Sequence, residues 1–189
     1  MAEGTDQQLV DKVLSGNKNA FNLLVLRYQH RMVALIGRFI QDPQEVEDVC
    51  QEAFIKAYRA LPLFRGDSAF YTWLYRIAVN TAKNHLVSRK RRPPTSDLEV
   101  TEAEASEIGS VLREIENPEA SLATDKLKSA IDAAIQDLPE DLRTAFTLRE
   151  FSGLSYEDIT KVMDCPVGTV RSRIFRAREA IDKRIRELL

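Results

Sequence analysis

The chain has 189 residues, of which 44% are hydrophobic and 30% are charged, and its formal net charge is −2. This composition is typical of a globular protein with a substantial core and excludes a mainly disordered chain. The longest apolar stretch, residues 21–40, is interrupted by three arginines and a histidine, so it is not expected to cross a membrane. Because no basic and then apolar leader opens the chain, the sequence predicts a cytoplasmic protein.

The residue types that hold metals or perform catalysis are scarce. The two cysteines, Cys50 and Cys165, and the two histidines, His30 and His85, share no metal-ligand spacing. We therefore expect no metal site and no cofactor, and we interpret both cysteines as small buried apolar residues. No nucleophile and base pair, paired carboxylates or phosphate-binding loop is visible, so the sequence predicts a protein without catalytic activity.

The charges are sorted along the chain. Residues 62–92 carry seven basic and one acidic side chain, and residues 166–189 carry seven basic and three acidic ones. Between them, residues 93–165 carry six basic and seventeen acidic side chains. Two basic segments on either side of an acidic one indicate that the protein contacts a polyanion at two separate places.

The hydrophobic periodicity predicts helices throughout the chain except in one segment. Residues 93–118 are acidic, lack aromatic side chains and have no useful apolar stripe, so they predict a flexible linker. The fold class is therefore all-α, with one small helical domain over residues 1–92 and a second over residues 119–189. The expected helices cover residues 6–15, 20–40, 44–61 and 69–92 in the first domain, and 122–138, 139–153, 154–164 and 165–181 in the second.

The second domain carries the pattern of a helix-turn-helix over about residues 155–178. Gly153 stands where a helix end favours a left-handed residue, and Ser155 with Asp158 resembles a capping box. Thr160 replaces the usual alanine of the motif, and Asp164 replaces the usual glycine. The apolar positions of the motif are Ile159, Met163, Cys165 and Val170.

The last helix of this motif has a buried stripe and a polar reading side. Val170, Ile174, Ala177 and Ile181 form the stripe, and an exposed Phe175 among arginines needs a partner to cover it. Arginines can contact guanine edges or phosphates, and an apolar group can cover a thymine methyl. The alternative is a solvated basic face. The candidate DNA-binding residues are Arg171, Ser172, Arg173, Phe175 and Arg176.

The helix over residues 69–92 predicts a second and different nucleic-acid surface. An indole, two amides and two cations share one side of it, which suits single-stranded nucleic acid, and the preceding loop adds two candidates. The opposite side is apolar and includes His85, interpreted as a packed core histidine. The alternative is that Trp73 packs on a neighbouring helix. The candidates are Phe64, Arg65, Trp73, Arg76, Asn80, Lys83 and Asn84.

A third surface lies on the helix over residues 44–61. Its buried stripe is expected at Val46, Val49, Cys50, Ala53, Ala57 and Leu61, and Ile55 stands on the opposite side among acidic and polar residues. An isoleucine with a polar rim is typical of a protein-docking anchor, although single exposed apolar residues are also ordinary.

These surfaces, in this order, resemble the extracytoplasmic-function (group IV) sigma factors of bacterial RNA polymerase, of the sigma-E/AlgU-like type. The resemblance rests on "DVCQEAFIKAYRAL", "FRGDSAFYTWLYRIAVNTAKN", "LPEDLRTAFTLREFSGLSYEDI" and "CPVGTVRSRIFRAREAID". It implies that residues 1–92 are sigma domain 2 and residues 119–189 sigma domain 4. It also implies a monomer when free, and partners that include core RNA polymerase, through its β′ clamp helices and β subunit, and promoter DNA.

The resemblance assigns a role to each surface. The residues Asp48, Gln51, Glu52, Ile55, Lys56 and Arg59 would bind core polymerase. The surface around Trp73 would melt and read the −10 element of stress-response promoters as a single strand, and the surface around Phe175 would read the −35 element as duplex. A membrane-anchored anti-sigma factor would hold the protein inactive at the inner membrane.

Two other functions remain open at this point. An autonomous helix-turn-helix regulator of transcription would bind duplex DNA unaided, but this leaves the surface around Trp73 without a purpose. An enzyme or adaptor would use Trp73 and Asn80 to hold a small ligand, and promoter melting would then not depend on Trp73.

Overall fold

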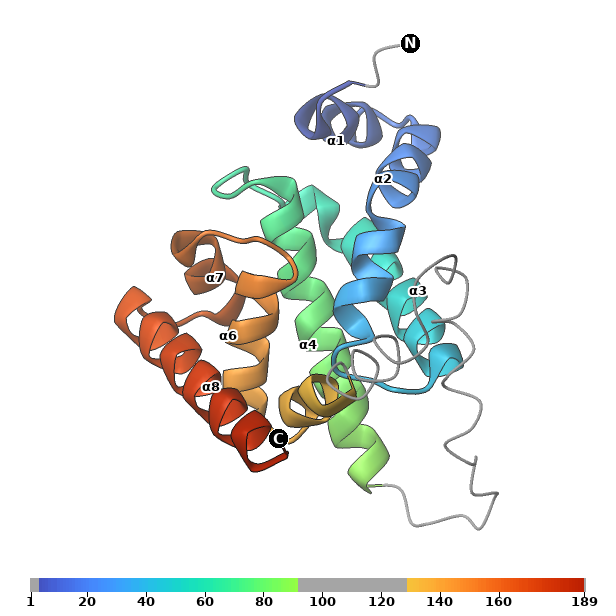
Figure 1. The fold of residues 1–189 in the computed structure, drawn as a ribbon. Coiled ribbons are helices and arrows are strands. Elements are labelled where there is room, and N and C mark those ends of the chain that lie inside the picture. The colour runs from blue at the N-terminus through green and yellow to red at the C-terminus, as the bar shows by residue number, and fades with distance from the viewer. Residues whose placement is uncertain (1–3, 92–128, 189) are drawn as a thin grey trace, which may run out of the picture.

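The computed structural model describes residues 4–91 and 129–188, and every regular element in these ranges is a helix, which confirms the all-α prediction. The predicted linker, residues 93–118, and the first part of the predicted helix 122–138 lie outside the described residues. The first group of helices is α1 (Asp6–Leu14), α2 (Lys18–Ile36), α3 (Pro43–Ala60), the short 3-10 helix η1 (Leu61–Leu63) and α4 (Phe70–Arg91) (Figure 1). The second group is a helical segment over 129–136, α6 (Glu140–Glu150), α7 (Tyr156–Met163) and α8 (Val167–Leu188).

Local sequence signals begin the helices of the first group. The Thr5 hydroxyl accepts a hydrogen bond from the backbone N–H of Gln8, and the Gln8 side chain accepts one from the Thr5 N–H, which is a capping box at α1. The Asp42 side chain accepts hydrogen bonds from the backbone N–H groups of Gln44 and Glu45 at 2.8 and 3.2 Å, and Pro43 occupies the first turn of α3.

Two predicted helix boundaries are wrong. The last helix, predicted to end at residue 181, continues to Leu188 as α8. The sequence predicted a helix over residues 20–40, but α2 ends at Ile36. A turn over residues 37–39 follows the helix. The side chains of Phe39 and Ile40 lie outside the helix and are buried, at 4% and 2% exposure. The apolar run therefore continues past the helix because the connection to α3 is itself packed into the core.

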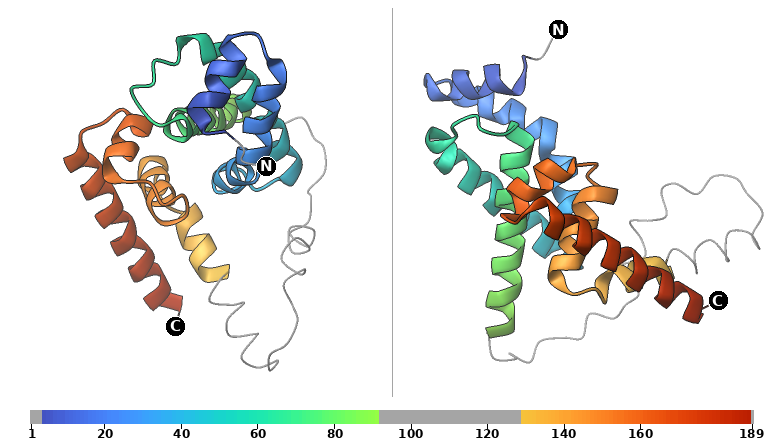
Figure 2. Two further views of the ribbon diagram at one scale, coloured as in Figure 1. Left: turned by 90° about the horizontal axis from the view of Figure 1, so that it is seen from above. Right: turned by 90° about the vertical axis from the view of Figure 1, so that its left-hand side faces the viewer.

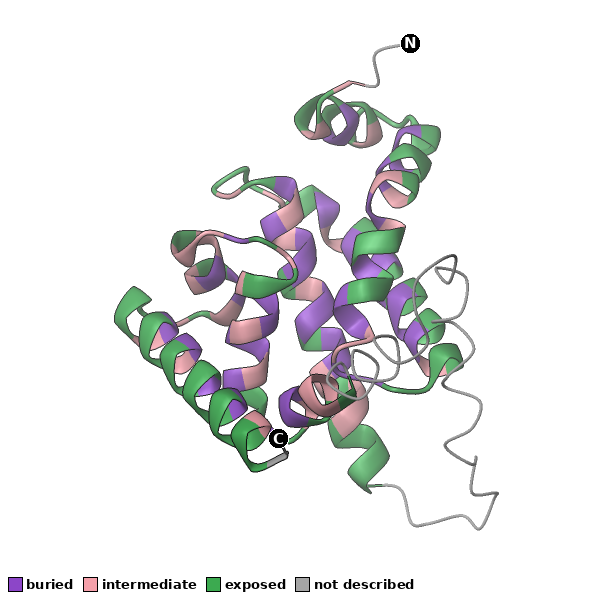
Figure 3. Cartoon of the chain, viewed as in Figure 1, coloured by how far each residue is buried: buried purple, intermediate pink, exposed green. Residues whose placement is uncertain are grey.

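Helix α4 forms the centre of the molecule. It contacts α2 and α3 on one side and α7 of the second group on the other (Figure 1). Leu74, Ala78 and Ala82, predicted to line its apolar side, are fully buried. Figure 3 shows that buried positions follow the inward sides of the helices while the outer sides are exposed.

The helix-turn-helix is formed by α7 and α8. Gly153, with φ +67°, precedes it in the left-handed region, which confirms that prediction. The Ser155 hydroxyl accepts the Asp158 backbone N–H at 3.0 Å and donates to the Asp158 carboxylate at 2.8 Å, so the serine cap of the predicted capping box is confirmed, with Asp158 bound to the hydroxyl in place of the Ser155 backbone N–H. Asp164, in the turn, has φ 51° and ψ 52°. This left-handed backbone explains why glycine is usual there, and Asp is among the residues that tolerate it.

The two groups of helices pack side by side (Figure 2). Buried side chains of α6, α7 and α8, including Leu148, Ile159 and Ile174, belong to the same apolar cluster as the core of the first group. A smaller cluster around Ile135, Leu138 and Ile181 stabilises the far end of the second group. The interface is therefore part of the hydrophobic core rather than a surface contact.

Candidate nucleic-acid and protein interfaces

An aromatic cluster stands at the start of α4. The ring centroids of Phe64 and Trp73 are 5.1 Å apart, and those of Phe70 and Trp73 are 5.8 Å apart. Phe70 is buried, whereas Phe64 and Trp73 are partly exposed. The interpretation that Trp73 packs on its neighbours is thus correct for part of the ring, and the remaining part faces solvent. A ring held in this way is a rigid surface on which a base can stack.

The polar candidates continue from this cluster along α4. Arg76, Asn80 and Asn84 are exposed, and Lys83 is partly buried. Arg65 is exposed in the loop before α4, next to Gly66, whose φ is +76°. The structure thus brings the seven predicted residues to one end and one side of α4.

His85 differs from the prediction of a packed core histidine. Its side chain is 29% exposed, and its Nε2 lies 3.4 Å from a carboxylate oxygen of Glu45, which also pairs with Arg89 at 2.9 Å. The apolar stripe of α4 ends before His85, because α3 presents the first-turn carboxylate of Glu45 there instead of an apolar surface.

The second group places acidic side chains against the polar side of α4. Lys83 Nζ lies 3.0 Å from Glu140 Oε1 and 3.5 Å from Asp141 Oδ1, both at the start of α6. Arg76 Nη2 lies 3.5 Å from Asp164 Oδ2. Arg76, Asn80 and Lys83 therefore line, together with residues of α6 and α7, a small cavity of about 220 Å³ between the two groups.

Asp158 joins α7 to the first turn of α4. Thr72 donates a hydrogen bond to Asp158 Oδ1 at 3.0 Å, and Tyr71 donates one to Oδ2 at 3.2 Å. Burial acts to raise the pKa of Asp158, but hydrogen bonds from Ser155, Thr72 and Tyr71 and the charge of Lys161 outweigh it and hold this pKa below its ordinary value. Nearby, Lys161 Nζ donates to the Asp67 carbonyl at 3.0 Å.

Helix α8 has the predicted division into two sides. Val170, Ile174, Ala177 and Ile181 are buried, which confirms the stripe. Phe175 is 62% exposed, and Ser172 and Arg176 beside it are exposed as well. A large exposed aromatic ring on a rigid helix fits a surface that becomes covered in a complex.

The arginines of α8 are not equivalent. Arg173 pairs with Asp141 Oδ2 at 2.6 Å and donates a hydrogen bond to Cys165 Sγ at 3.4 Å. The Arg171 guanidinium lies 5.7 Å from the centroid of the Tyr156 ring, and Arg178 pairs with Glu150. Arg176 makes no such contact with any described residue. Asp141 therefore contacts one candidate of α4, Lys83, and one of α8, Arg173.

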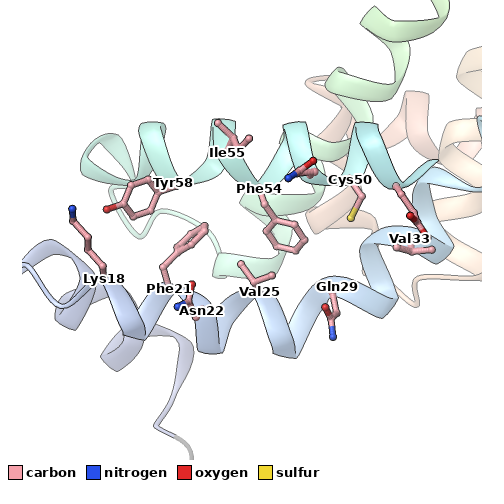
Figure 4. Close-up of a pocket in the computed structure, with 12 residues that line it drawn as sticks. Lys18, Phe21, Asn22, Val25, Gln29, Val33, Cys50, Phe54, Ile55 and Tyr58 are labelled. Carbon is pink, nitrogen blue, oxygen red and sulfur yellow. The ribbon is translucent and has the colours of Figure 1, made fainter. Parts of the chain in front are cut away.

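A groove of about 730 Å³ runs between α2 and α3 (Figure 4). Phe21 and Val25 of α2 and Phe54 and Tyr58 of α3 form its apolar lining, and Gln51 and Ile55 lie at the same groove. Ile55 is 45% exposed and Tyr58 is 38% exposed. The periodicity of α3 alone does not reveal this groove, because α2 contributes half of the lining.

The predicted face of α3 has the expected exposure. Asp48, Gln51, Glu52, Ile55 and Arg59 are exposed, and Lys56 is partly buried and pairs with Glu52 at 2.8 Å. The predicted buried stripe is confirmed at all six positions, which are Val46, Val49, Cys50, Ala53, Ala57 and Leu61.

The cysteines are in different environments. Burial, with a smaller effect of Glu47, raises the pKa of Cys50 to about 11, so the thiol stays protonated at neutral pH. Cys165 is only partly buried, which corrects the prediction of a buried residue, because it lies in the turn beside Arg173. Within residues 4–91 and 129–188, no cluster of His, Cys, Asp or Glu could hold a metal ion. None of the helices described is long and apolar enough to span a membrane.

Comparison with known proteins assigns both groups of helices to one family. The model of Sigma-70 region 2 matches residues 24–92, and the model of Sigma-70, region 4 matches residues 128–181. The RNA polymerase sigma-H factor of Pseudomonas aeruginosa is 64% identical over 189 residues, covering 100% of this chain and 98% of that protein. The ECF RNA polymerase sigma-E factor of Escherichia coli strain K12 is 61% identical over 185 residues, covering 98% and 96%.

A solved structure supports the same assignment. CnrH, solved in complex with the cytosolic domain of CnrY, is 25% identical and superposes with a TM-score of 0.67 over 94% of this chain and 95% of that chain. The likeness extends over both groups of helices, and the sequence matches extend over both region models. The chain therefore belongs to the extracytoplasmic-function group of the sigma-70 family of RNA polymerase sigma factors.

Proposed function

We propose that this sigma factor uses three separate surfaces, one to bind core polymerase and one to read each of the two promoter elements. The α2–α3 groove and the exposed face of α3 bind core polymerase, α4 melts and reads the −10 element, and α8 reads the −35 element. The observation that carries the proposal is the row of polar side chains on α4, which starts from a partly exposed aromatic cluster. A helix whose only role is to pack in the core has no use for a row of polar side chains on one side. The proposed function involves no catalysis.

The −10 element is read as a single strand. An extruded base stacks on the open part of the Trp73 ring, which Phe64 and Phe70 hold in place at centroid distances of 5.1 and 5.8 Å. Asn80 and Asn84 present amides to base edges farther along α4. Arg65, Arg76 and Lys83 supply the cations that meet the backbone phosphates.

The −35 element is read as duplex in the major groove. Phe175 and Arg176 lie exposed on the outer side of α8, where Phe175 can cover a thymine methyl and Arg176 can contact a guanine edge. Arg171 and Ser172 flank them and are suited to phosphates. Arg173 contacts DNA only after it leaves Asp141, because that pair is closed at 2.6 Å.

Core polymerase binds at α3 through the β′ clamp helices, and through β elsewhere. Ile55 is the apolar anchor at the groove, and Asp48, Gln51, Glu52, Lys56 and Arg59 form its polar rim. A helical partner fits a groove between two helices, since its apolar side can be buried on Phe54 and Tyr58.

An anti-sigma factor controls access to this surface. CnrH was solved with the cytosolic domain of CnrY, and this chain shares its two-part fold. We propose that a membrane-anchored partner covers the groove and holds the protein at the inner membrane until a stress signal releases it. The anti-sigma factor and the clamp helices therefore compete for the groove, because it cannot hold both at once.

The decisive experiment is transcription in vitro with core polymerase and a panel of promoters. Trp73→Ala is expected to abolish permanganate reactivity of the melted −10 region while the complex with core polymerase still forms. Ile55→Ala is expected to weaken that complex several-fold, whereas Val87→Ala, at an equally exposed apolar residue on α4, leaves it unchanged.

The result also decides against the remaining alternatives. An autonomous regulator would bind duplex DNA tightly and specifically in a gel-shift assay without polymerase. A protein that uses Trp73 and Asn80 for a small ligand would melt promoters equally well after Trp73→Ala. Either outcome contradicts the proposal.

A further inference from the structure

We propose that helix α1 positions the aromatic cluster of the −10 surface, formed by Phe64, Phe70 and Trp73, and that Asp6 is the residue through which it does so. This role of α1 rests on the proposed function of that cluster in reading the −10 element. The sequence predicted no candidate residue on α1, and the match to the Sigma-70 region 2 model begins only at residue 24. Positioning the cluster gives this helix a function.

The Asp6 carboxylate, in the first turn of α1, fixes the position of Tyr28 on α2. Its Oδ2 accepts a hydrogen bond from the Tyr28 hydroxyl, and its Oδ1 accepts one from Arg27, which also donates to the Gly4 carbonyl at 2.9 Å. Tyr28 is only 4% exposed, so without Asp6 its hydroxyl would be a buried donor that lacks this acceptor. Burial, and then the bond to Asp6, raise the pKa of Tyr28 above its ordinary value, so the phenol stays protonated and keeps donating.

The Tyr28 ring packs against the aromatic cluster. Its centroid lies 5.8 Å from that of Phe70, and the two rings are inclined by 52°. The Phe70 centroid lies 6.0 Å from that of Phe64 and 5.8 Å from that of Trp73, and Phe70 is only 4% exposed. Phe70 therefore contacts Tyr28 as well as the two rings that a base would meet, and a displaced Tyr28 ring would leave space beside it.

Helix α1 also supports the cluster through η1, which α1 contacts. Leu9 and Val10 of α1 and Leu61 of η1 are each 1% exposed and belong to one apolar cluster. The Leu61 carbonyl accepts the backbone N–H of Phe64 at 3.0 Å. The backbone that carries Phe64 is therefore placed by the same helix that holds Tyr28.

Rigidity matters at this surface because a base gains most from stacking on a ring that is already in place. A side chain that becomes ordered on binding costs part of the binding free energy, whereas a ring held in advance costs less. Trp73 is partly exposed, so the packing of its neighbours determines how firmly it is held. Asp6 is thus a positioning residue, which acts on the −10 strand through Tyr28 and Phe70.

The test uses the full-length protein and two matched tyrosine variants. Tyr28→Phe removes the hydroxyl that binds Asp6 and keeps the ring. Tyr75→Phe is the control, because it removes another buried tyrosine hydroxyl, at 3% exposure on α4, whose hydrogen-bond partner is Arg31. Urea unfolding and binding to core polymerase are measured for both variants, since a role in stability alone would change unfolding without changing the cluster.

Trp73 is the one tryptophan of the chain, so its fluorescence reports on the cluster directly. In the free protein, Tyr28→Phe is expected to increase the quenching of Trp73 by acrylamide, and Tyr75→Phe to leave it at the wild-type value. With core polymerase, permanganate reactivity of the −10 region follows promoter opening. The rate of opening is expected to fall about threefold to tenfold for Tyr28→Phe, because the ring must then be ordered during binding, and to stay near wild type for Tyr75→Phe.

Two variants of Asp6 identify it as the partner. Asp6→Ala removes the acceptor and is expected to slow promoter opening, whereas Asp6→Asn keeps a side-chain oxygen at this position and is expected to retain most of the wild-type rate. Combining Asp6→Ala with Tyr28→Phe is expected to slow opening little more than Asp6→Ala alone, because both changes remove the same hydrogen bond. Fully additive losses would show that Asp6 and Tyr28 act separately.

Equal quenching of Trp73 in Tyr28→Phe and Tyr75→Phe, or equal rates of opening in these two variants, would overturn the positioning role. The proposed function is tested separately by Trp73→Ala. If Trp73→Ala abolishes melting while Tyr28→Phe opens promoters at the rate of Tyr75→Phe, the −10 role stands and only the positioning by α1 fails. If Trp73→Ala leaves melting intact, the −10 role itself fails.

Discussion

Helices α4 and α8 carry similar residues but differ in what surrounds them. Each buries an apolar stripe and collects arginine, lysine and an aromatic ring on its other side. On α8 the ring and one arginine, Phe175 and Arg176, are open to solvent, whereas on α4 the cations Arg76 and Lys83 face carboxylates of another part of the chain. A face rich in cations is therefore not always an unpaired face, because acidic side chains from elsewhere in the chain can neutralise it.

The largest effect on stability is expected in the hydrophobic core that α4 and α8 share. Leu74→Ala in α4 and Ile174→Ala in α8 each remove a fully or almost fully buried side chain and should each lower the free energy of unfolding by about 2–5 kcal/mol. Urea unfolding followed by circular dichroism measures both. A single transition that shifts in both variants supports one cooperative unit, and a separate transition affected by Ile174→Ala alone would contradict the shared core. Val87→Ala, at an exposed position of α4, is the control.

The next effect concerns reading by α8. Arg176→Ala should weaken binding of the polymerase complex to the −35 duplex by about 1–3 kcal/mol if Arg176 contacts a base edge. The loss should depend on which base pair occupies that position. Arg186→Ala, which removes the same charge near the far end of α8, is the control. An equal loss on every sequence would make Arg176 a phosphate contact instead.

A smaller effect is expected at the link between α7 and α4. Asp158→Asn keeps the shape of the side chain but removes the charge that accepts hydrogen bonds from Thr72 and Tyr71, so we expect a loss of about 1 kcal/mol in stability. Glu157→Gln, on the same helix and exposed, should change stability little. Equal losses in the two variants would mean that the link to α4 contributes nothing.

The same residue predicts a pH dependence. The pKa of Asp158 is held below its ordinary value of 3.8 in the folded protein. Its contribution to stability is therefore fully present above pH 3.8 and is lost as the pH falls through the lowered pKa. Unfolding curves between pH 5 and pH 2 should show a steeper loss for wild type than for Asp158→Asn. Parallel curves would exclude Asp158 as the source.

The smallest effect is expected at the surface of α8. Glu150→Gln breaks the pair with Arg178, in which both side chains are substantially exposed, so stability should fall by no more than about 1 kcal/mol. Thermal unfolding at low and high salt measures it, and the difference should shrink at high salt. A larger, salt-independent loss would show that this pair does more than join two exposed charges.

The periodicity of the sequence predicted the inward sides of the helices correctly, because burial repeats with the helix turn. Five stripe positions in α3, the sixth at Leu61 in η1, and all four in α8 are buried. The same periodicity misplaced the end of α2, since Phe39 and Ile40 are apolar for reasons of tertiary packing and not of helix geometry. The side of a helix that a residue faces follows from local periodicity. The end of α2 depends on tertiary packing.

The candidate residues were found, but their partners were not. Lys83 and Asp141 lie far apart in the sequence, as do Arg76 and Asp164, and no periodicity connects them. From the sequence alone, each cation is interpreted as a ligand for DNA, because periodicity describes only the helix that carries it. The groove between α2 and α3 was missed for the same reason, since a surface made by two helices needs their relative placement.

The carboxylate shared by Lys83 and Arg173 has a thermodynamic consequence. Asp141 cannot hold Lys83 unchanged if −35 DNA draws Arg173 away and alters the charge around it. Occupation of one promoter element is then coupled to occupation of the other, and linkage makes this coupling reciprocal. Released from Arg173, Asp141 would hold Lys83 more tightly, so a bound −35 element would weaken binding of DNA at the −10 surface, and Asp141→Asn would return the two elements to independence.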